Sequence, residues 1–481
     1  MIRFLVNRDD SPGDKMPLAI TSEQDRVALR GQIGIMAVLG FAVCSCAPHG
    51  PAHYRANGVY QSFDISSAAT YRDYQDALRK DLTANWRDLF ATDENYAGRD
   101  AAQVSVLVEQ LMPTDRPPII RPQAGDRKRS MLLLHGLYDS PYGMRDLEQF
   151  FCEHGFHTRS LLLPGHGTRP GNLLEIDREE WIKAVDFGVR SLHREIGGDI
   201  YIAGFSTGGA LALRQAMIHP ESVDGLFLFA PAIQVPAQAS QQVLKGLGFQ
   251  WPPFQKLLDR DFASYESGCL DATIEVSRLG NEVQALLDDH PLDIPIMIVA
   301  AENDYSIKTD TTRTLFENRK FGKRSKMFIY TPLDGRRTPG AEAVDATPAG
   351  RWPQYQPVEL NSRFIYTMAG RNYQIADYSH MALTMKPDDP HYGLAGEYQY
   401  CHHYFLWPGS ARNRNRCGRG ANNEVCYGER KMIGANSYSV SREQTVVRRL
   451  TSNPKFDRLE HEMSRFIGQH IAPTKRPDRE R

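Results

Sequence analysis

One serine stands between two glycines at the end of an apolar run. The stretch Gly204-Phe205-Ser206-Thr207-Gly208 follows "DIYIA" and is followed by the helix-forming residues "GALAL". This G-x-S-x-G spacing is typical of a sharp strand-to-helix turn that exposes a serine hydroxyl as a nucleophile. Small residues are needed at 204 and 208 because larger side chains would collide with the strand or the helix. A glycine-rich bend with an incidental serine would show the same pattern, so other residues must decide whether Ser206 is a nucleophile.

A serine hydroxyl needs a base within reach and a carboxylate that orients the base. In chains with this turn, the carboxylate and then the histidine follow the serine. Asp304 ends the apolar run "IPIMIVAAEND", and His380 lies in "ADYSHMALT", before a helical pattern. We therefore expect Ser206 to be the nucleophile, Asp304 the orienting acid and His380 the general base. The alternatives are, for the acid, Asp310 and Asp334 and, for the base, His391, His402 and His403.

An earlier run, "MLLLHGLYDS", ends in His135-Gly136-Leu137. Gly136 leaves room for a substrate, so the Leu137 N–H is expected to bind a tetrahedral oxyanion together with the Thr207 N–H. His135 is expected to fix this loop by hydrogen bonding. His166 in "LPGHGTRPGN" precedes the serine and is expected to be structural. The glycines there lack the G-K-[ST] of a phosphate loop, which argues against nucleotide binding.

Short apolar runs alternate with helical patterns over much of the chain. The helical patterns include 142–155, 179–197 and 207–220, and the strand-like runs are 130–136, 156–164, 199–206, 223–232, 294–304 and 326–332. Near-continuous apolar strands separated by helices predict a mostly parallel sheet covered by helices on both faces. Ligands bind at the carboxyl ends of such strands, where the candidate residues fall.

Three segments interrupt this alternation. Residues 233–292 are predicted to form a cap insertion between two strands, and 333–371 and 385–440 are predicted to be extra insertions. Residues 46–125 are predicted to form an N-terminal helical extension and linker, ahead of a catalytic domain over 126–481.

The chain has seven cysteines, and three of them lie in the last insertion. A disulfide between Cys417 and Cys426 is expected to staple this arginine- and asparagine-rich segment. Cys401, His402 and His403 are adjacent, but they lack the paired spacing of a zinc site, so no metal is expected.

The N-terminal residues resemble an export signal. Arg26 and Arg30 precede an apolar stretch at 33–43, which is too short to span a bilayer comfortably. Val43-Cys44-Ser45-Cys46 resembles a bacterial lipobox, so 1–45 is predicted to be a signal peptide and Cys46 the lipidated residue. An ordinary signal, an uncleaved anchor and a buried helix are the alternatives. Lipidation would hold the protein on the membrane of the cell envelope, and Ala47 favours the outer membrane of a Gram-negative cell.

The composition excludes one class of partner. The 481 residues are 41% hydrophobic and 24% charged, with a formal net charge of −1. A nucleic-acid-binding protein would need a clustered basic face, which this balance does not suggest. The sequence names no protein partner.

The motifs "LLLHGL", "LLLPGHGTRPGNL", "GFSTGG", "AENDYSI" and "SHMALT" occur in an order that resembles the α/β hydrolases. The resemblance is to their serine aminopeptidase-like branch, which includes monoacylglycerol lipases and small carboxylesterases. It implies the α/β-hydrolase fold and the roles given above for Ser206, Asp304, His380 and the Leu137 and Thr207 amides. It also implies a serine hydrolase that cleaves an ester or lipid substrate without a cofactor. An aminopeptidase or amidase, or a catalytically silent envelope binding protein, are the alternatives.

The chain departs from this family between the acid and the base. Asp304 and His380 are 76 residues apart, where the family needs about one strand and a short loop. The strand before the histidine is either "KMFIYTP" or "NYQIA", and the sequence leaves both open.

Overall fold

A computed structural model of the chain describes residues 70–93, 102–120, 127–174, 176–236, 254–255, 261–265, 267–302, 304, 306–331, 355–359, 365–368, 371–378, 380–393, 396 and 445–471. All of them lie in one compact unit, Pro51–Arg481. Several predictions concern residues outside this part of the chain, namely the signal peptide at 1–45, the lipidation of Cys46, the Cys417–Cys426 disulfide, and the candidates Asp334, Cys401, His402 and His403.

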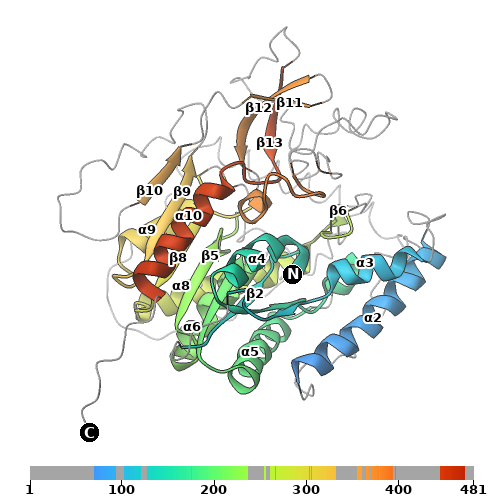
Figure 1. Cartoon of the computed structure of the whole chain (residues 1–481), viewed down its shortest axis with the longest axis horizontal. Helices are drawn as coiled ribbons and strands as arrows, with labels where there is room; N and C mark the ends of the chain where they lie inside the picture. The colour runs from blue at the N-terminus through green and yellow to red at the C-terminus, as the bar shows by residue number, and fades with distance from the viewer. Residues whose placement is uncertain are drawn as a thin grey trace, which may run out of the picture. The chain divides into compact units, whose positions relative to one another are not determined.

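The centre of the described unit is an eight-stranded sheet with the order β1-β3-β2-β4-β5-β8-β9-β10 (Figure 1). Its strands are β1 Asp115–Arg116, β2 Arg129–Leu134, β3 His157–Leu161, β4 Asp199–Phe205, β5 Gly225–Phe229, β8 Ile296–Ala301, β9 Lys326–Thr331 and β10 Tyr355–Glu359. All neighbours pair in parallel except β1, which runs antiparallel to β3 at the edge. The apolar runs of β2, β4, β5 and β8 are buried, as central parallel strands require.

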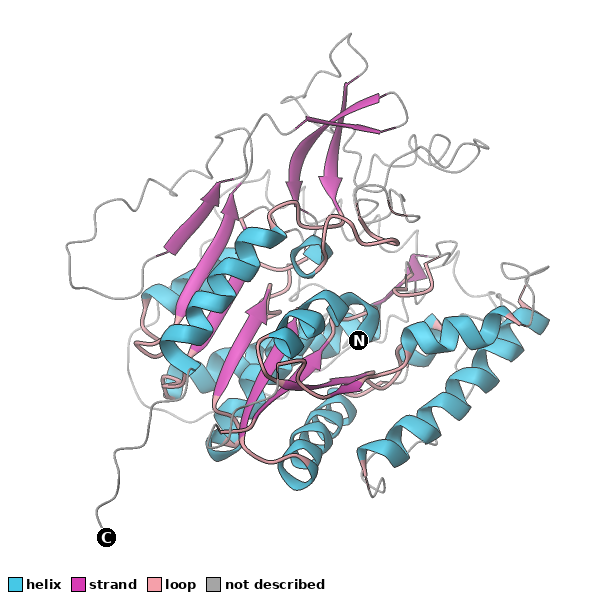
Figure 2. Cartoon of the chain, viewed as in Figure 1, coloured by secondary structure: helices cyan, strands magenta, loops and turns pink. Residues whose placement is uncertain are grey.

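Helices cover both faces of this sheet (Figure 2). The helices α4 Arg145–Glu153 and α10 Phe456–Phe466 lie on one face, where Phe466 packs against Phe227 of β5 and the Ser464 hydroxyl bonds to His154. The helices α5 Arg178–Glu195, α6 Thr207–Ile218 and α8 Leu270–Asp289 pack together on the other face. The helix α9 Thr309–Glu317 connects β8 to β9. The predicted α/β-hydrolase fold is confirmed.

The segment 233–292, which is expected to form a cap, also contains a helix that covers the main sheet. Its last third is α8, which packs on α6 and leads into β8, as a crossover helix of a parallel sheet must. A cap is thus confined to residues 233–269, where the described elements are the short strands β6 Phe254–Gln255 and β7 Gly268–Cys269. The cap itself stays a prediction.

Both candidate runs in the long interval before His380 form strands. "KMFIYTP" forms β9 in the main sheet, and "NYQIA" lies in β12 Arg371–Tyr378, directly upstream of the histidine. A second sheet joins β11 Ile365–Met368, β12 and β13 Thr445–Leu450, with β12 and β13 parallel. The extra residues before His380 therefore add β10 to the edge of the main sheet and supply β11 and β12 to a separate sheet, which β13 completes from farther along the chain.

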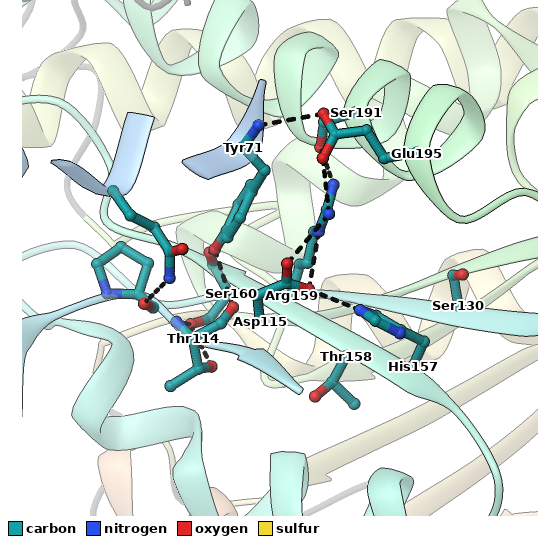
Figure 3. Close-up of polar contacts among 12 residues, drawn as sticks. Tyr71, Thr114, Asp115, Ser130, His157, Thr158, Arg159, Ser160, Ser191 and Glu195 are labelled. Atoms are coloured by element: carbon teal, nitrogen blue, oxygen red, sulfur yellow. Dashed lines mark hydrogen bonds and ion pairs between the residues drawn. The ribbon is translucent and has the colours of Figure 1, made fainter. Parts of the chain in front are cut away.

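The N-terminal extension is fastened to the edge of the main sheet. It consists of α2 Tyr71–Thr92, which begins with a Thr70–Asp73 capping box, and α3 Gln103–Leu111. Figure 3 shows the buried Arg159 between Asp115 and Glu195, while Glu195 also accepts the Tyr71 N–H. Farther along α2, the Trp86 indole donates to the Gly167 carbonyl at 3.0 Å. The extension thus braces the loop that follows β3.

No helix among the described residues combines the length and apolar character that crossing a membrane requires.

Candidate active site

Ser206 occupies a strained corner between β4 and α6. Its φ is 52° and its ψ is −113°, a conformation that costs free energy for any residue with a side chain. Three backbone hydrogen bonds hold the corner. The Ser206 N–H donates to the Phe229 carbonyl at 2.9 Å, and its carbonyl accepts from Ala210 and Ala232. The end of β5 and the first turn of α6 therefore fix the direction in which the side chain leaves the backbone.

The two glycines of the motif are required by close backbone approaches. A Cβ on Gly204 would lie 2.4 Å from the Gly208 carbonyl oxygen, and a Cβ on Gly208 would lie 2.3 Å from the Leu134 carbonyl oxygen. Backbone atoms cannot move aside as side-chain ends can, so both positions exclude larger residues. The spacing therefore has a steric cause in this chain, and it is not an incidental bend.

The structure brings Asp304 and His380 together across the long interval in sequence. Asp304 follows β8, its side chain is fully buried, and its Oδ2 lies 2.5 Å from His380 Nδ1. Its Oδ1 accepts the N–H groups of Ser306 and Ile307 at 2.8 and 3.1 Å. Burial by itself would raise the pKa of Asp304, but the charge and hydrogen bond of His380 and these two N–H groups lower it below its ordinary value. The carboxylate is therefore ionised throughout the neutral range.

His380 also contacts the corner that carries the serine. It begins the short helix η7 His380–Thr384, and its ring packs against Phe205, the neighbour of Ser206, with a centroid distance of 4.8 Å. Its Nε2 is buried and has no hydrogen-bond partner among the described residues, so no bond to the Ser206 hydroxyl is formed. Catalytic hydrogen bonds are often long in enzymes without substrate. The nitrogen remains available on the side of the ring away from Asp304.

The loop after β2 lies against Ser206. A Cβ on Gly136 would be 3.1 Å from Ser206 Cβ and 2.9 Å from the Phe205 ring, so this glycine allows the loop to approach. Within the described part of the chain, neither the Leu137 N–H nor the Thr207 N–H donates a hydrogen bond. Thr207 begins α6, where the helix dipole favours negative charge. Two amides are therefore free to bind an anion beside Ser206.

His135 and His166 hold the neighbouring loops. The Leu163 N–H donates to His135 Nε2 at 3.0 Å, and this assigns the ring proton to Nδ1, which lies 2.8 Å from the Gly136 carbonyl. Burial, followed by the nearby His166, lowers the pKa of His135 well below its ordinary value. Burial also lowers the pKa of His166 to about 4, and its Nδ1 contacts the Leu163 and Pro164 carbonyls. Both imidazoles are neutral at pH 7 and form structural hydrogen bonds.

The other described candidates lie elsewhere. Asp310 is 68% exposed and pairs with Arg313 one turn later in α9, so it does not approach His380. His391 is buried, and its Nε2 lies 2.9 Å from Asp261 Oδ1, a carboxylate that the sequence analysis did not single out. No spacing rule connects residues 261 and 391, and only folding shows this second pair.

Tyr138 has no signal in the sequence, because its φ of 69° and its hydrogen bonds depend on the fold. Within the described ranges, no group of three or more His, Cys, Asp or Glu side chains is arranged to hold a metal ion.

Comparisons with known proteins agree with this fold. Residues 131–363 match the model of the alpha/beta hydrolase family, a range that contains Ser206 and Asp304 and ends before His380. A thermostable monoacylglycerol lipase of Bacillus sp. (strain H-257) is 24% identical over 194 residues, which are 39% of this chain and 75% of the lipase. A carboxylesterase of Bacillus subtilis (strain 168) is 23% identical over 199 residues, which are 40% of this chain and 78% of the esterase.

Among solved structures, the monoacylglycerol lipase of Paleococcus ferrophilus aligns with a TM-score of 0.37 and 19% identity over 46% of this chain and 88% of that one. The family and curated matches confirm the resemblance inferred from the motifs.

Proposed function

We propose that this chain, which has the α/β-hydrolase fold and is similar to a monoacylglycerol lipase and a carboxylesterase, hydrolyses carboxylic esters through Ser206, His380 and Asp304. The observation that carries this proposal is the pairing of the buried Asp304 carboxylate with His380, whose imidazole packs beside the strained corner of Ser206. A base that is oriented by an acid and lies next to a serine hydroxyl is the arrangement that activates a serine.

In the proposed first half-reaction, Ser206 Oγ attacks the ester carbonyl carbon while His380 Nε2 takes the hydroxyl proton. The carbonyl oxygen becomes an oxyanion, which accepts hydrogen bonds from the Leu137 and Thr207 N–H groups. The C–O bond to the alcohol then breaks, and the imidazolium returns its proton to the leaving alcohol. Ser206 is left as an acyl ester.

In the second half-reaction, His380 takes a proton from water, and the hydroxide attacks the acyl carbon. Collapse of the second tetrahedral intermediate breaks the bond to Ser206 Oγ, which takes back the proton. Asp304 keeps its negative charge throughout and stabilises the imidazolium at Nδ1. Its three hydrogen-bond partners keep it oriented for both steps.

The test is active-site labelling with a fluorophosphonate probe combined with turnover of short p-nitrophenyl esters. We expect one label per chain, none in Ser206→Ala, and a loss of about a million-fold in kcat in that variant. A preserved rate in Ser206→Ala contradicts the mechanism, and an unlabelled wild-type protein that turns over no ester indicates a silent binding protein. Faster hydrolysis of aminoacyl anilides than of esters assigns the same residues to an aminopeptidase or amidase.

For the substrate we propose an acylglycerol, lysolipid or short-chain ester. Support comes from the relative named as a monoacylglycerol lipase and from the lipobox-like Cys46, which would hold the protein on a membrane of the cell envelope. Metabolic labelling with a palmitate analogue tests the anchor. Incorporation that disappears in Cys46→Ser supports it, and incorporation that persists there contradicts it.

A further inference from the structure

Tyr138 holds the loop beside Ser206 in an unusual conformation. The Asp139 N–H donates to the Gly136 carbonyl at 3.3 Å, which closes a four-residue turn with Leu137 and Tyr138 at its centre. The φ of Tyr138 is 69°, the positive value that a type II turn requires at this position. Glycine is the usual residue there because a side chain makes positive φ unfavourable. A tyrosine in this place must be held by contacts outside the turn.

Those contacts come from the segment that ends at the start of α8. The Tyr138 hydroxyl accepts the Cys269 N–H at 2.9 Å and lies 2.8 Å from both the Cys269 carbonyl and the Thr273 hydroxyl. The Tyr138 carbonyl accepts the Tyr265 N–H at 2.7 Å. Burial raises the pKa of the phenol above its ordinary value, so the hydroxyl keeps its proton. Side chain and backbone are thus both fixed.

Leu137 lies between two fixed neighbours. Gly136 is in close contact with Phe205 and Ser206 on one side, and Tyr138 is bound to Cys269 and Tyr265 on the other. If Tyr138 relaxed to negative φ, the peptide group between Leu137 and Tyr138 would reverse its direction and displace the Leu137 backbone. A shift of about 1 Å in a catalytic group can cost about 100-fold in rate.

We infer that Tyr138 is a positioning residue, which keeps the turn in its strained form and thereby aims the Leu137 N–H at the oxyanion formed on Ser206. The inference rests on the proposed function, because it needs an acyl-transfer oxyanion beside Ser206. It also links the segment before α8 to catalysis, since the residues that hold Tyr138 are Tyr265, Cys269 and Thr273.

Tyr138→Phe removes the hydroxyl and leaves the ring. The matched control is Tyr142→Phe in η4 Pro141–Met144, four residues along the same loop, because the Tyr142 hydroxyl makes no hydrogen bond in the described part of the chain. Fluorophosphonate titration counts the competent Ser206 in each variant. We expect Tyr138→Phe to lower kcat per titrated site by about 10- to 100-fold with KM changed less than about threefold. The control should stay within about twofold of wild type.

An alkyl boronic acid, which forms a tetrahedral adduct on serine, gives a second readout. Its affinity for Tyr138→Phe should fall by the same factor as kcat, since both depend on the oxyanion contact. A purely structural role would reduce the fraction of sites that titrate and leave kcat per site unchanged, and that result overturns the inference. So does a kcat for Tyr138→Phe equal to that of the control.

Tyr138→Gly tests the turn itself. Glycine adopts positive φ without strain, so the turn can persist after the whole side chain is lost. We expect a higher kcat per titrated site for Tyr138→Gly than for Tyr138→Phe, and the reverse order contradicts the inference.

If Tyr138→Phe does not fold, Thr273→Val, which removes one partner of the hydroxyl, serves for the same measurements. Failure of the wild type to label with fluorophosphonate refutes the proposed function instead, so the two failures are distinguishable.

Discussion

Two histidine–aspartate pairs with a buried carboxylate lie in the described part of the chain, and they differ in what surrounds the imidazole. His380 contacts Asp304 through Nδ1 at 2.5 Å, and His391 contacts Asp261 through Nε2 at 2.9 Å. The ring of His380 packs beside Phe205, next to the nucleophile candidate.

The surroundings of His391 are those of a packed core. Its ring contacts Tyr142, Phe262 and Tyr392, with centroid distances of 5.8, 4.5 and 4.5 Å. The second oxygen of Asp261 accepts the Tyr392 hydroxyl at 2.6 Å. The backbone N–H groups of His391 and Tyr392 donate to Asp389, which pairs with Arg145 of α4.

The comparison shows that residue type and pairing do not by themselves define a catalytic base. Each aspartate is buried and accepts hydrogen bonds from a histidine and from backbone N–H groups, two for Asp304 and, among the described residues, one for Asp261. The His380 pair stands at the carboxyl ends of core strands, where ligands of parallel sheets bind. The His391 pair joins α4, the segment before α8 and the chain after His380, so we expect it to stabilise the fold.

The largest expected contrast comes from His380→Ala and His391→Ala. Loss of the base at His380 should lower kcat by about 10⁵- to 10⁶-fold. Loss of His391 should leave kcat per titrated site within about threefold. It should lower the free energy of unfolding by about 3 kcal/mol, because a buried carboxylate loses a partner. Ester turnover and urea unfolding measure the two effects, and comparable kcat losses in both variants would erase the distinction between the pairs.

A smaller contrast is expected from the two carboxylates. Asp304→Asn should lower kcat by about 10⁴-fold, because the amide no longer stabilises the imidazolium and the tautomer changes. Asp261→Asn leaves the size of the side chain unchanged, and this residue lies away from the reacting groups. We therefore expect kcat to change by less than about threefold. Steady-state kinetics on a p-nitrophenyl ester, corrected for titrated sites, gives both values. Equal losses would mean that Asp304 has no special role.

The smallest effect concerns Asp139, in the loop between Tyr138 and α4. Burial, with a smaller contribution from nearby Asp261, raises the pKa of this carboxyl to about 8, while hydrogen bonds from the Ser140 and Gly136 backbone oppose the rise. Between the ordinary pKa of an aspartate, about 4, and about 8, the folded state holds a proton that the unfolded state has lost. The free energy of unfolding should therefore fall as pH rises through this window.

Asp139→Asn removes this titration and keeps an oxygen for the Ser140 N–H, which lies 2.8 Å from Asp139 Oδ1. We expect the variant to gain stability relative to wild type at pH 8.5 and to lose that advantage at pH 4. Urea unfolding at both pH values checks this. A constant difference between the two proteins would show that Asp139 does not titrate in this range.

Much of the fold could be predicted from local patterns. Runs such as "SMLLL" and "IMIVAA" are apolar throughout because both faces of a central parallel strand are buried. The turn at Ser206 could be predicted because only glycine fits at 204 and 208, and this steric requirement appears in the sequence as the G-x-S-x-G motif. The pairing of Asp304 with His380 was expected from their order along the chain, and it is present in the structure.

Other features had no local signature. Residues 326–378 are divided between two sheets, and this division depends on which strands pair with one another in the folded chain. The segment 233–292 was read as one insertion, since its sequence does not say that α8 covers the sheet.

From the sequence alone came the nucleophile candidate, the preferred candidates for its acid and base, and the parallel sheet. Sterics and periodicity over a few neighbouring residues give the serine and the sheet, and the order along the chain gives the acid and base. Only the tertiary structure decided which histidine packs beside Ser206, which histidine pairs with Asp261 in the core, and which tyrosine holds the turn that contains Leu137. Those relations join residues more than a hundred positions apart, and their distances are set by packing, which no short stretch of sequence records.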